Sequence, residues 1–468
     1  MNGGTFAPGV EKERAGIYFR FTSAANDRLS VGERGTVALP LELSWGAPKT
    51  FVEINGPDDV LKKYGLSVND SSVLLLKEAM KRSQTVLAYR VNEGSKAETV
   101  IGESSGGGGS DGDDEEEGAS GQSNGLRAVA KFGGMKGNDI QIRVSENVLD
   151  SELFDVTTYL NNVAVNRQSV RRSSELQDND WVSFEGSGRL QETAGTNLSG
   201  GTNSEARTWD YTDFLSAAEH VSYDTIGLPV DDEDQLKTTF VSFVKRMRDE
   251  TGIKITGVLP NFDGDHEGII NVTSSVELAE RKLNVAETVA WVAGASAGAT
   301  INQSLTFVDY EGAIGVNEDL DDDEIKERLR NGEFLFHYDP RDRTVSVEKD
   351  INSFTSFTAE KNYRFSKNLI VRVLDAINND ITRELKALIK LRKDRGQDIP
   401  GSNDGKQIIR SLITVYLNAL QEGGAIKNFD PSDDIDIVLT DQEDGFIINL
   451  GAQPVDAAEK FYFDTEVR

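Results

Sequence analysis

One short segment has the residue types of a catalytic motif. Gly294-Ala-Ser296-Ala-Gly298 matches the GxSxG pattern in which a serine hydrolase carries its nucleophile. That pattern needs a strand before the serine and a helix after it, whereas here a predicted helix precedes it. Only three histidines are available as bases, His220, His266 and His337. Close packing of small residues is the favoured interpretation, and a serine hydrolase using Ser296 is the alternative function.

Two other segments resemble ligand-binding loops. Gly401–Lys406 reads GSNDGK, which is one residue short of the GxxxxGK phosphate loop and is followed by Gln407 instead of Ser or Thr. We interpret it as a loop before a helix. Asp263–Gly268 starts like a calcium loop, but Ser274 stands where the bidentate glutamate belongs, so an acidic surface turn is expected. With no cysteine and three isolated histidines, the sequence predicts no metal site, no cofactor and no catalytic residues.

A basic cluster stands out in a chain whose net charge is −29. It lies at the end of a long predicted helix and consists of Arg383, Lys386, Lys390, Arg392, Lys393 and Arg395. Basic residues at a helix C-terminus interact favourably with the helix dipole, which alone could explain them. They would also suit an acidic partner surface. The residues themselves leave both explanations open.

Composition excludes several classes of protein. An acidic excess of this size argues against binding nucleic acid through its phosphates, which requires Lys and Arg in excess. No apolar run approaches the roughly 20 residues of a membrane span. The start of the sequence lacks the basic and apolar regions of a secretory signal. We therefore expect a protein that is assembled in the cytoplasm without membrane insertion.

Strands and helices alternate in two blocks, 31–100 and 202–345, which predicts one α/β domain split in the sequence. Short strand-like runs separated by turn residues fill 126–201 and predict an inserted small β domain. The expected strands are 36–41, 51–54, 85–91, 126–132, 139–146, 153–160, 180–186, 225–228, 253–259 and 305–310, with a hairpin at 334–348. The expected helices are 57–64, 71–82, 211–220, 233–251, 276–293 and 321–330.

Between the first block and the β domain, residues 101–125 are Gly-rich and acidic. Such a segment cannot bury enough apolar surface to offset its ordering entropy, so a flexible, solvated loop is expected, with cation binding as the alternative. Within residues 346–450, helices are expected at 366–395 and 407–421 and strands at 435–439 and 446–450. The fold class is thus α/β (α+β).

The two ends of the chain, 1–30 and 451–468, have the pattern of extended strands. Phe461, Phe463 and Val467 alternate with polar residues, as Ile17, Phe19 and Phe21 alternate with Tyr18, Arg20 and Thr22. Unpaired strands invite pairing with another chain. We expect both ends to be arms for neighbouring copies of the protein. Pairing of each arm within its own subunit is the alternative.

Several segments resemble the contractile tail sheath proteins of myophages and phage-tail-like particles, in particular those of Gram-positive prophage type. The likeness is carried by AGASAGATINQSLTFVDYEGA, GEFLFHYDPRDRTVSVEKDINSFTSFT and FSKNLIVRVLDAINNDI in the core, and by GGTFAPGVEKERAGIYFRF at the start. FDVTTYL and DNDWVSF resemble the inserted domain of these proteins. Residues 102–125 have no counterpart in the family pattern.

The resemblance implies a structural protein, not an enzyme: a virion component that forms six-subunit rings, stacked helically around an inner tail tube. Its implied partners are further copies of itself, the tube protein, and baseplate and tail terminator proteins. Contraction would drive the tube through a bacterial envelope. The resemblance implies that residues 346–450 form a C-terminal α/β polymerisation domain, assigns the strand arms to exchange between subunits, and favours the basic cluster as a tube contact. Gly451 and Pro454 in one arm, and Gly3-Gly4 and Pro8-Gly9 in the other, are the candidate hinges.

Overall fold

The computed structural model of the chain describes residues 34–102, 125–441 and 444–467. These residues form two compact units, one comprising 34–379 with 454–467 and the other comprising 380–453. The predicted arm residues Ile17, Phe19 and Phe21 and most of the acidic Gly-rich segment lie outside the described residues.

The first unit is built on a seven-stranded sheet that the two sequence blocks share, as the split-domain prediction requires. All neighbours in the sheet are parallel except β2, which is antiparallel to β3 at one edge. The strand order is β16 (Glu333–Phe334), β13 (Ile269–Val272), β12 (Thr256–Pro260), β11 (Thr225–Gly227), β1 (Thr36–Leu41), β3 (Thr85–Arg90) and β2 (Phe51–Ile54).

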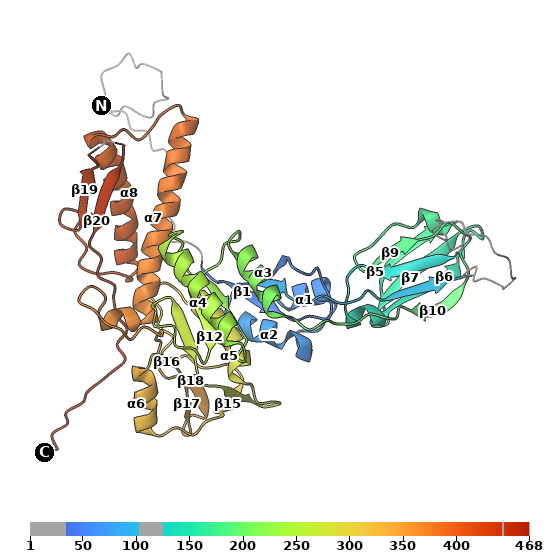
Figure 1. The fold of residues 1–468 in the computed structure, drawn as a ribbon, viewed down its shortest axis with the longest axis horizontal. Helices are drawn as coiled ribbons and strands as arrows, with labels where there is room; N and C mark the ends of the chain where they lie inside the picture. Colours follow the sequence, from blue (N-terminus) through green and yellow to red (C-terminus); the bar gives the residue numbers. More distant parts are fainter. Residues whose placement is uncertain (1–33, 103–124, 442–443, 468) are drawn as a thin grey trace, which may run out of the picture. The chain divides into compact units, whose positions relative to one another are not determined.

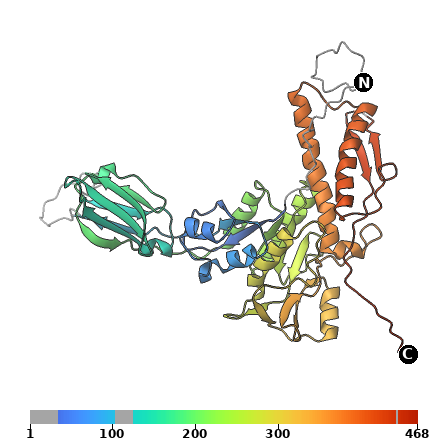
Figure 2. The ribbon, with the colours of Figure 1, turned by 180° about the vertical axis from the view of Figure 1, so that it is seen from behind.

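Helices cover both faces of this sheet because its strands are apolar on both sides. In β1, Val37 and Leu39 join the core with α2 and α5, whereas Ala38 joins the core with α3 and α4. Figure 1 shows α4 in front of β12, and Figure 2 shows the same chain from behind. The helices of this domain are α1 (Pro57–Tyr64), α2 (Leu74–Met80), α3 (Thr208–Ala218), α4 (Asp234–Asp249) and α5 (Val285–Gly298).

The inserted β domain consists of two antiparallel sheets around a core of its own (Figure 1). The three-stranded sheet contains β4 (Glu98–Ile101), β5 (Leu126–Ala130) and β9 (Val182–Glu185). The four-stranded sheet contains β10 (Thr193–Asn197), β6 (Ile140–Glu146), β7 (Phe154–Leu160) and β8 (Val163–Val170). Trp45, from the first block, stacks on Trp181 with 5.4 Å between ring centroids and so joins this core.

Smaller elements complete the first unit. β14 (Val276–Leu278) pairs with β15 (Ala313–Val316), and β17 (Phe336–Asp339) pairs with β18 (Thr344–Val347) in the expected hairpin. The acidic helix α6 (Asp322–Arg330) begins as predicted, because the Asp321 carboxylate accepts hydrogen bonds from the backbone N–H groups of its first turn.

Helix α7 (Asn368–Asp394) starts in the first unit, and its residues from Asp380 onward belong to the second. The rest of the second unit consists of α8 (Asn403–Glu422) and the antiparallel pair β19 (Ile435–Leu439) and β20 (Phe446–Leu450). Tyr416 of α8 donates a hydrogen bond of 2.8 Å to Asp380 of α7. The expected 346–450 domain starts earlier along the chain than this unit.

Two of the expected elements are wrong. Only the second part of the helix expected at 276–293 is helical, because α5 starts at Val285. The first part is strand β14, followed by a turn. Asn284 caps α5, with the Glu287 side chain bonding back to the cap residue. The strand expected at 305–310 is interrupted by a turn at 306–307, where Phe307 has φ = 64° and its N–H bonds to the carbonyl of Val347. Only Asp309 forms an isolated bridge, with Ser346.

Candidate functional site

The C-terminal segment carries the arm residues that the structure describes. Residues 455–467 form no strand within the chain. Phe461, Phe463 and Val467 are 70%, 89% and 94% exposed, which is unusual for three large apolar side chains within seven residues. Pairing of this arm within its own subunit is therefore not what the described residues show.

The β19–β20 hairpin is the single sheet among the described residues of the second unit. Ile435 and Ile437 are buried, while Val438 and its cross-strand partner Ile447 are 46% and 55% exposed on the other face. Among the described residues, neither strand has a neighbour on its outer edge. Each outer edge therefore presents backbone N–H and C=O groups that a further strand could pair with.

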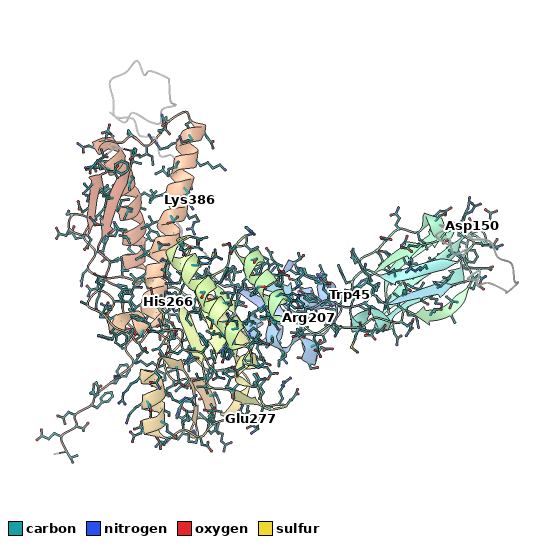
Figure 3. The ribbon with its side chains drawn as sticks, in the orientation of Figure 1. Trp45, Asp150, Arg207, His266, Glu277 and Lys386 are labelled. Atoms are coloured by element: carbon teal, nitrogen blue, oxygen red, sulfur yellow. The ribbon has the colours of Figure 1, made fainter. Side chains whose placement is uncertain are left out.

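The basic cluster at the end of α7 is exposed except for Arg392, which is half-buried. Part of it is neutralised locally: Arg383 pairs with Asp380 at 2.9 Å, and Lys393 pairs with Asp398 at 2.7 Å. In the part of the chain that the structure describes, Lys386, Lys390 and Arg395 have no ion-pair partner. Figure 3 labels Lys386 on this helix. These three cations remain available to an acidic partner.

The GASAG segment does not form a nucleophile elbow. Ser296 is 3% exposed and lies inside α5, not on a turn between a strand and a helix. A Cβ at Gly294 or Gly298 would overlap the carbonyl oxygens of Ala79 and Arg82, respectively. The glycines therefore let α5 approach the end of α2 closely, as the small-residue interpretation predicts.

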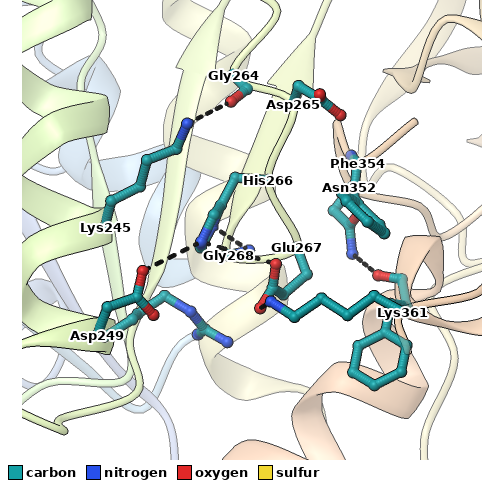
Figure 4. Close-up of polar contacts among 12 residues, drawn as sticks. Lys245, Asp249, Gly264, Asp265, His266, Glu267, Gly268, Asn352, Phe354 and Lys361 are labelled. Carbon is teal, nitrogen blue, oxygen red and sulfur yellow. Dashed lines mark hydrogen bonds and ion pairs between the residues drawn. The ribbon is translucent and has the colours of Figure 1, made fainter. Parts of the chain in front are cut away.

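The two segments that resemble ligand loops are structural. Residues 403–406 already belong to the first turn of α8, so the GSNDGK segment is mostly helix and not a loop. The Asp263–Gly268 segment is not a surface turn either, because His266 and Glu267 are 8% and 9% exposed. It is a buried junction, shown in Figure 4.

At this junction, polar groups from three parts of the first unit meet. His266 Nδ1 accepts a hydrogen bond of 3.0 Å from the N–H of Gly268, and its Nε2 lies 3.7 Å from Glu267 and 4.0 Å from Asp249 of α4 (Figure 4). Lys361 pairs with Glu267 at 2.6 Å. Sequence reasoning missed this network because its partners are far apart along the chain.

The ionisation of the junction follows from its burial. Desolvation lowers the pKa of His266 to about 4, although the negative charges of Glu267 and Asp249 act to raise it. The positive charges of Arg248 and Lys245 act in the same direction as desolvation. His266 is therefore neutral near pH 7, which is consistent with a structural role. Among the described residues, no group of three or more His, Asp or Glu side chains could hold a metal ion. No described helix has the length and hydropathy needed to cross a bilayer.

Models of phage tail sheath domains match nearly the whole sequence. Residues 34–91 match the tail sheath protein Gp18 domain III N-terminal region, and residues 112–203 match the phage tail sheath protein beta-sandwich domain. The second match includes residues 112–125, so the expectation that the whole segment 102–125 has no counterpart in the family is wrong for this part. Residues 205–353 match the phage tail sheath protein central domain, and residues 360–468 match the phage tail sheath C-terminal domain. The resemblance seen in the sequence is thus confirmed.

Known proteins agree with this assignment. The phage-like element PBSX protein XkdK of Bacillus subtilis (strain 168) is 53% identical, with 100% of each chain covered. The crystal structure of the sheath tail protein Lin1278 from Listeria innocua is 50% identical, with 94% of this chain and 96% of that chain covered and a TM-score of 0.81. The helical sheath of the anti-feeding prophage in its contracted state, 10% identical with 97% and 99% of the chains covered, shares the fold with a TM-score of 0.56. The chain belongs to the phage tail sheath protein family.

Proposed function

We propose that the chain polymerises around an inner tube through exchanged terminal β-strands and contracts to drive the tube through a bacterial envelope. The observation that carries this proposal is the exposure of Phe461, Phe463 and Val467, which lie in a segment that forms no strand with the other residues that the structure describes. The fold shared with a contractile sheath supports the same role. In this proposal, six-subunit rings stack helically.

We infer that the β19–β20 hairpin accepts this arm. A strand added to one of its outer edges would satisfy backbone groups that no described residue pairs with. Alternate side chains of the added strand would then face the exposed Val438–Ile447 side or the α8 side of the sheet. The arm has the matching period of apolar residues at Phe461 and Phe463. Exchange would thus convert two exposed apolar surfaces into one buried sheet.

The exposed cations of α7 fit an acidic tube surface. Lys386 and Lys390 lie one helical turn apart and so share one face of the helix. The other proposed partners are the baseplate and tail terminator proteins, with assembly in the host cytoplasm before the sheath joins a virion tail or tail-like particle. Contraction needs no cofactor if the extended assembly is metastable, because the bodies can move as rigid units while paired strands hold them together.

A paired set of arm variants tests the proposal. Replacing Phe461 and Phe463 by Ser removes the apolar side of the arm, and we expect folded subunits that no longer form tubes in negative-stain microscopy. The matched control replaces the neighbouring polar residues Lys460 and Asp464 by Ser and should still polymerise. Tubes of normal length from the F461S/F463S protein would refute strand exchange through this arm.

A further inference from the structure

The root of the C-terminal arm is fastened to the first unit by a lysine. Lys367 Nζ lies 2.7 Å from Asp456 and 3.7 Å from Glu459, two carboxylates three residues apart on the arm. The side chains of Lys367 and Glu459 are only 17% and 15% exposed. Partial burial shields this interaction from solvent and salt more than an exposed surface pair would be.

Two further contacts hold the same stretch. Arg364 Nη2 donates a hydrogen bond of 3.0 Å to the carbonyl of Pro454, and Thr306 Oγ1 donates one of 2.9 Å to Glu459. Thr306 Oγ1 also accepts a hydrogen bond from the N–H of Asp350. The position of the Thr306 hydroxyl is therefore fixed by the body of the protein. The arm root is thus held by side chains from two segments that are distant in the sequence.

Hydrogen bonds to a buried carboxylate fix the body side of these contacts. Asp350 is 2% exposed, accepts hydrogen bonds from the N–H of Leu305 and the side chain of Asn368, and so ties the turn at 305–306 to the first residue of α7. Lys367 directly precedes that residue. The start of α7, the longest described helix, therefore fixes the position of the lysine that holds the arm.

Exposure changes abruptly where these contacts end. Pro454 is buried, and Val455, Ala457 and Glu459 are half-buried, whereas every residue from Lys460 to Val467 is exposed. The alternation up to Glu459 shows one side of the segment lying against the body.

We propose that Lys367, Arg364 and Thr306 form a clasp that divides the arm into a fixed root, 454–459, and an exposed end segment that starts at Lys460. The functional consequence of the clasp rests on the proposed function: if strands are exchanged, the clasp sets how far the exchanged strand can reach. Nine residues, 460–468, reach about 30 Å when fully extended, whereas the eighteen residues from Gly451 onward would reach about 60 Å. The hinge therefore lies after Glu459 and not at Gly451 or Pro454.

Site-directed spin labelling of the unassembled protein tests the clasp directly. The chain has no cysteine, so Ala458→Cys and Thr465→Cys each give a single labelling site, one in the root and one in the exposed end segment. We expect slow, anisotropic motion at position 458 and fast motion at position 465. Fast motion at 458 in the otherwise unaltered protein would overturn the clasp.

Neutralising the clasp should release the root. In the D456N/E459Q protein, which alters only the arm, the motion at position 458 should become several-fold faster and approach that at 465. Lys367→Met should have the same effect, and Lys460→Met, which removes an exposed lysine outside the clasp, should have none. Unchanged slow motion at 458 in D456N/E459Q would refute the proposal. Because these measurements need no polymer, their outcome is independent of whether the F461S/F463S variant blocks tube formation.

Discussion

Arg248 of α4 and Asp375 of α7 form a buried two-pronged ion pair. The guanidinium Nη1 lies 2.7 Å from one carboxylate oxygen, and Nη2 lies 2.8 Å from the other. Nη1 also donates to the carbonyl of Ile255, and both side chains are less than 10% exposed. A Cβ at Gly268 would overlap the Arg248 side chain, so the absence of a side chain at this glycine leaves the space that the arginine occupies. The pair joins the first half of α7 to the α/β domain.

Removing one partner of this pair should destabilise the first unit strongly. In Asp375→Asn the guanidinium loses its countercharge inside the protein, which typically costs about 3–5 kcal/mol. The expected result is a lower midpoint in urea unfolding followed by circular dichroism.

The matched control for this prediction lies two residues away on α4. Arg246 pairs with Glu219, but its side chain is 40% exposed, so Arg246→Met should cost only about 0–1 kcal/mol. Equal losses in the two variants would show that burial does not decide the contribution of these pairs.

His266 predicts a specific pH dependence. Its pKa is about 4 in the folded protein and near 6.5 when unfolded, so the unfolded state takes up the proton first as the pH falls. The stability associated with neutral His266 is complete above pH 6.5 and is lost progressively down to about pH 4. The loss should approach about 1.4 kcal/mol per pH unit within this window.

His266→Gln isolates this contribution, because Gln keeps an acceptor for the N–H of Gly268 but does not titrate. The groups that face the imidazole, Asp249, Glu267, Lys245 and Arg248, are the same in both proteins. Urea unfolding at several pH values should show the wild type losing stability relative to the variant between pH 6.5 and 4. Parallel pH profiles would exclude His266 as the source.

The elements predicted well from the sequence are those with strong local signals. The apolar runs at Thr36–Leu41 and Thr85–Arg90 are strands as expected, and α6 begins at its Asp321 cap. The helix expected at 276–293 failed because Val276–Leu278 is apolar in either state and pairs with β15, a contact that only the fold provides. The Asn284-x-x-Glu287 capping box was the signal that marks the true start of α5.

The candidate sites depend on longer-range information. The arm pattern at Phe461 and Phe463 can be read directly from the sequence, but its anchoring by Lys367 depends on how α7 begins in the folded chain. In the same way, the GDHEG segment looks like a surface turn until residues near 350–361 cover it. Burial of polar residues by distant segments is the part that periodicity cannot predict.

The close approach of α5 to α2 can be tested at Gly294. Gly294→Ala would place a methyl group against the carbonyl of Ala79, and overpacking of this kind costs about 1–3 kcal/mol. Gly315→Ala is the control, since a Cβ there would meet only Glu277 side-chain atoms at 3.9 Å. Thermal unfolding should show a lower midpoint for the first variant only. A Gly294→Ala protein as stable as the control would mean that α5 can shift at no cost.

Charge reversal separates the two explanations of the basic cluster on α7. Lys386→Glu with Lys390→Glu changes two exposed side chains that pair with no carboxylate among the described residues, so subunit stability should change by only about 0.5 kcal/mol. If these lysines contact an acidic tube, the variant should fail to co-sediment with preformed tubes of a cognate tube protein. Lys62→Glu with Lys63→Glu on α1 makes the same change in net charge and should bind normally. Normal tube binding by the α7 variant would leave the helix dipole as the explanation of these lysines, because a charge that serves only its own helix has no effect on a partner.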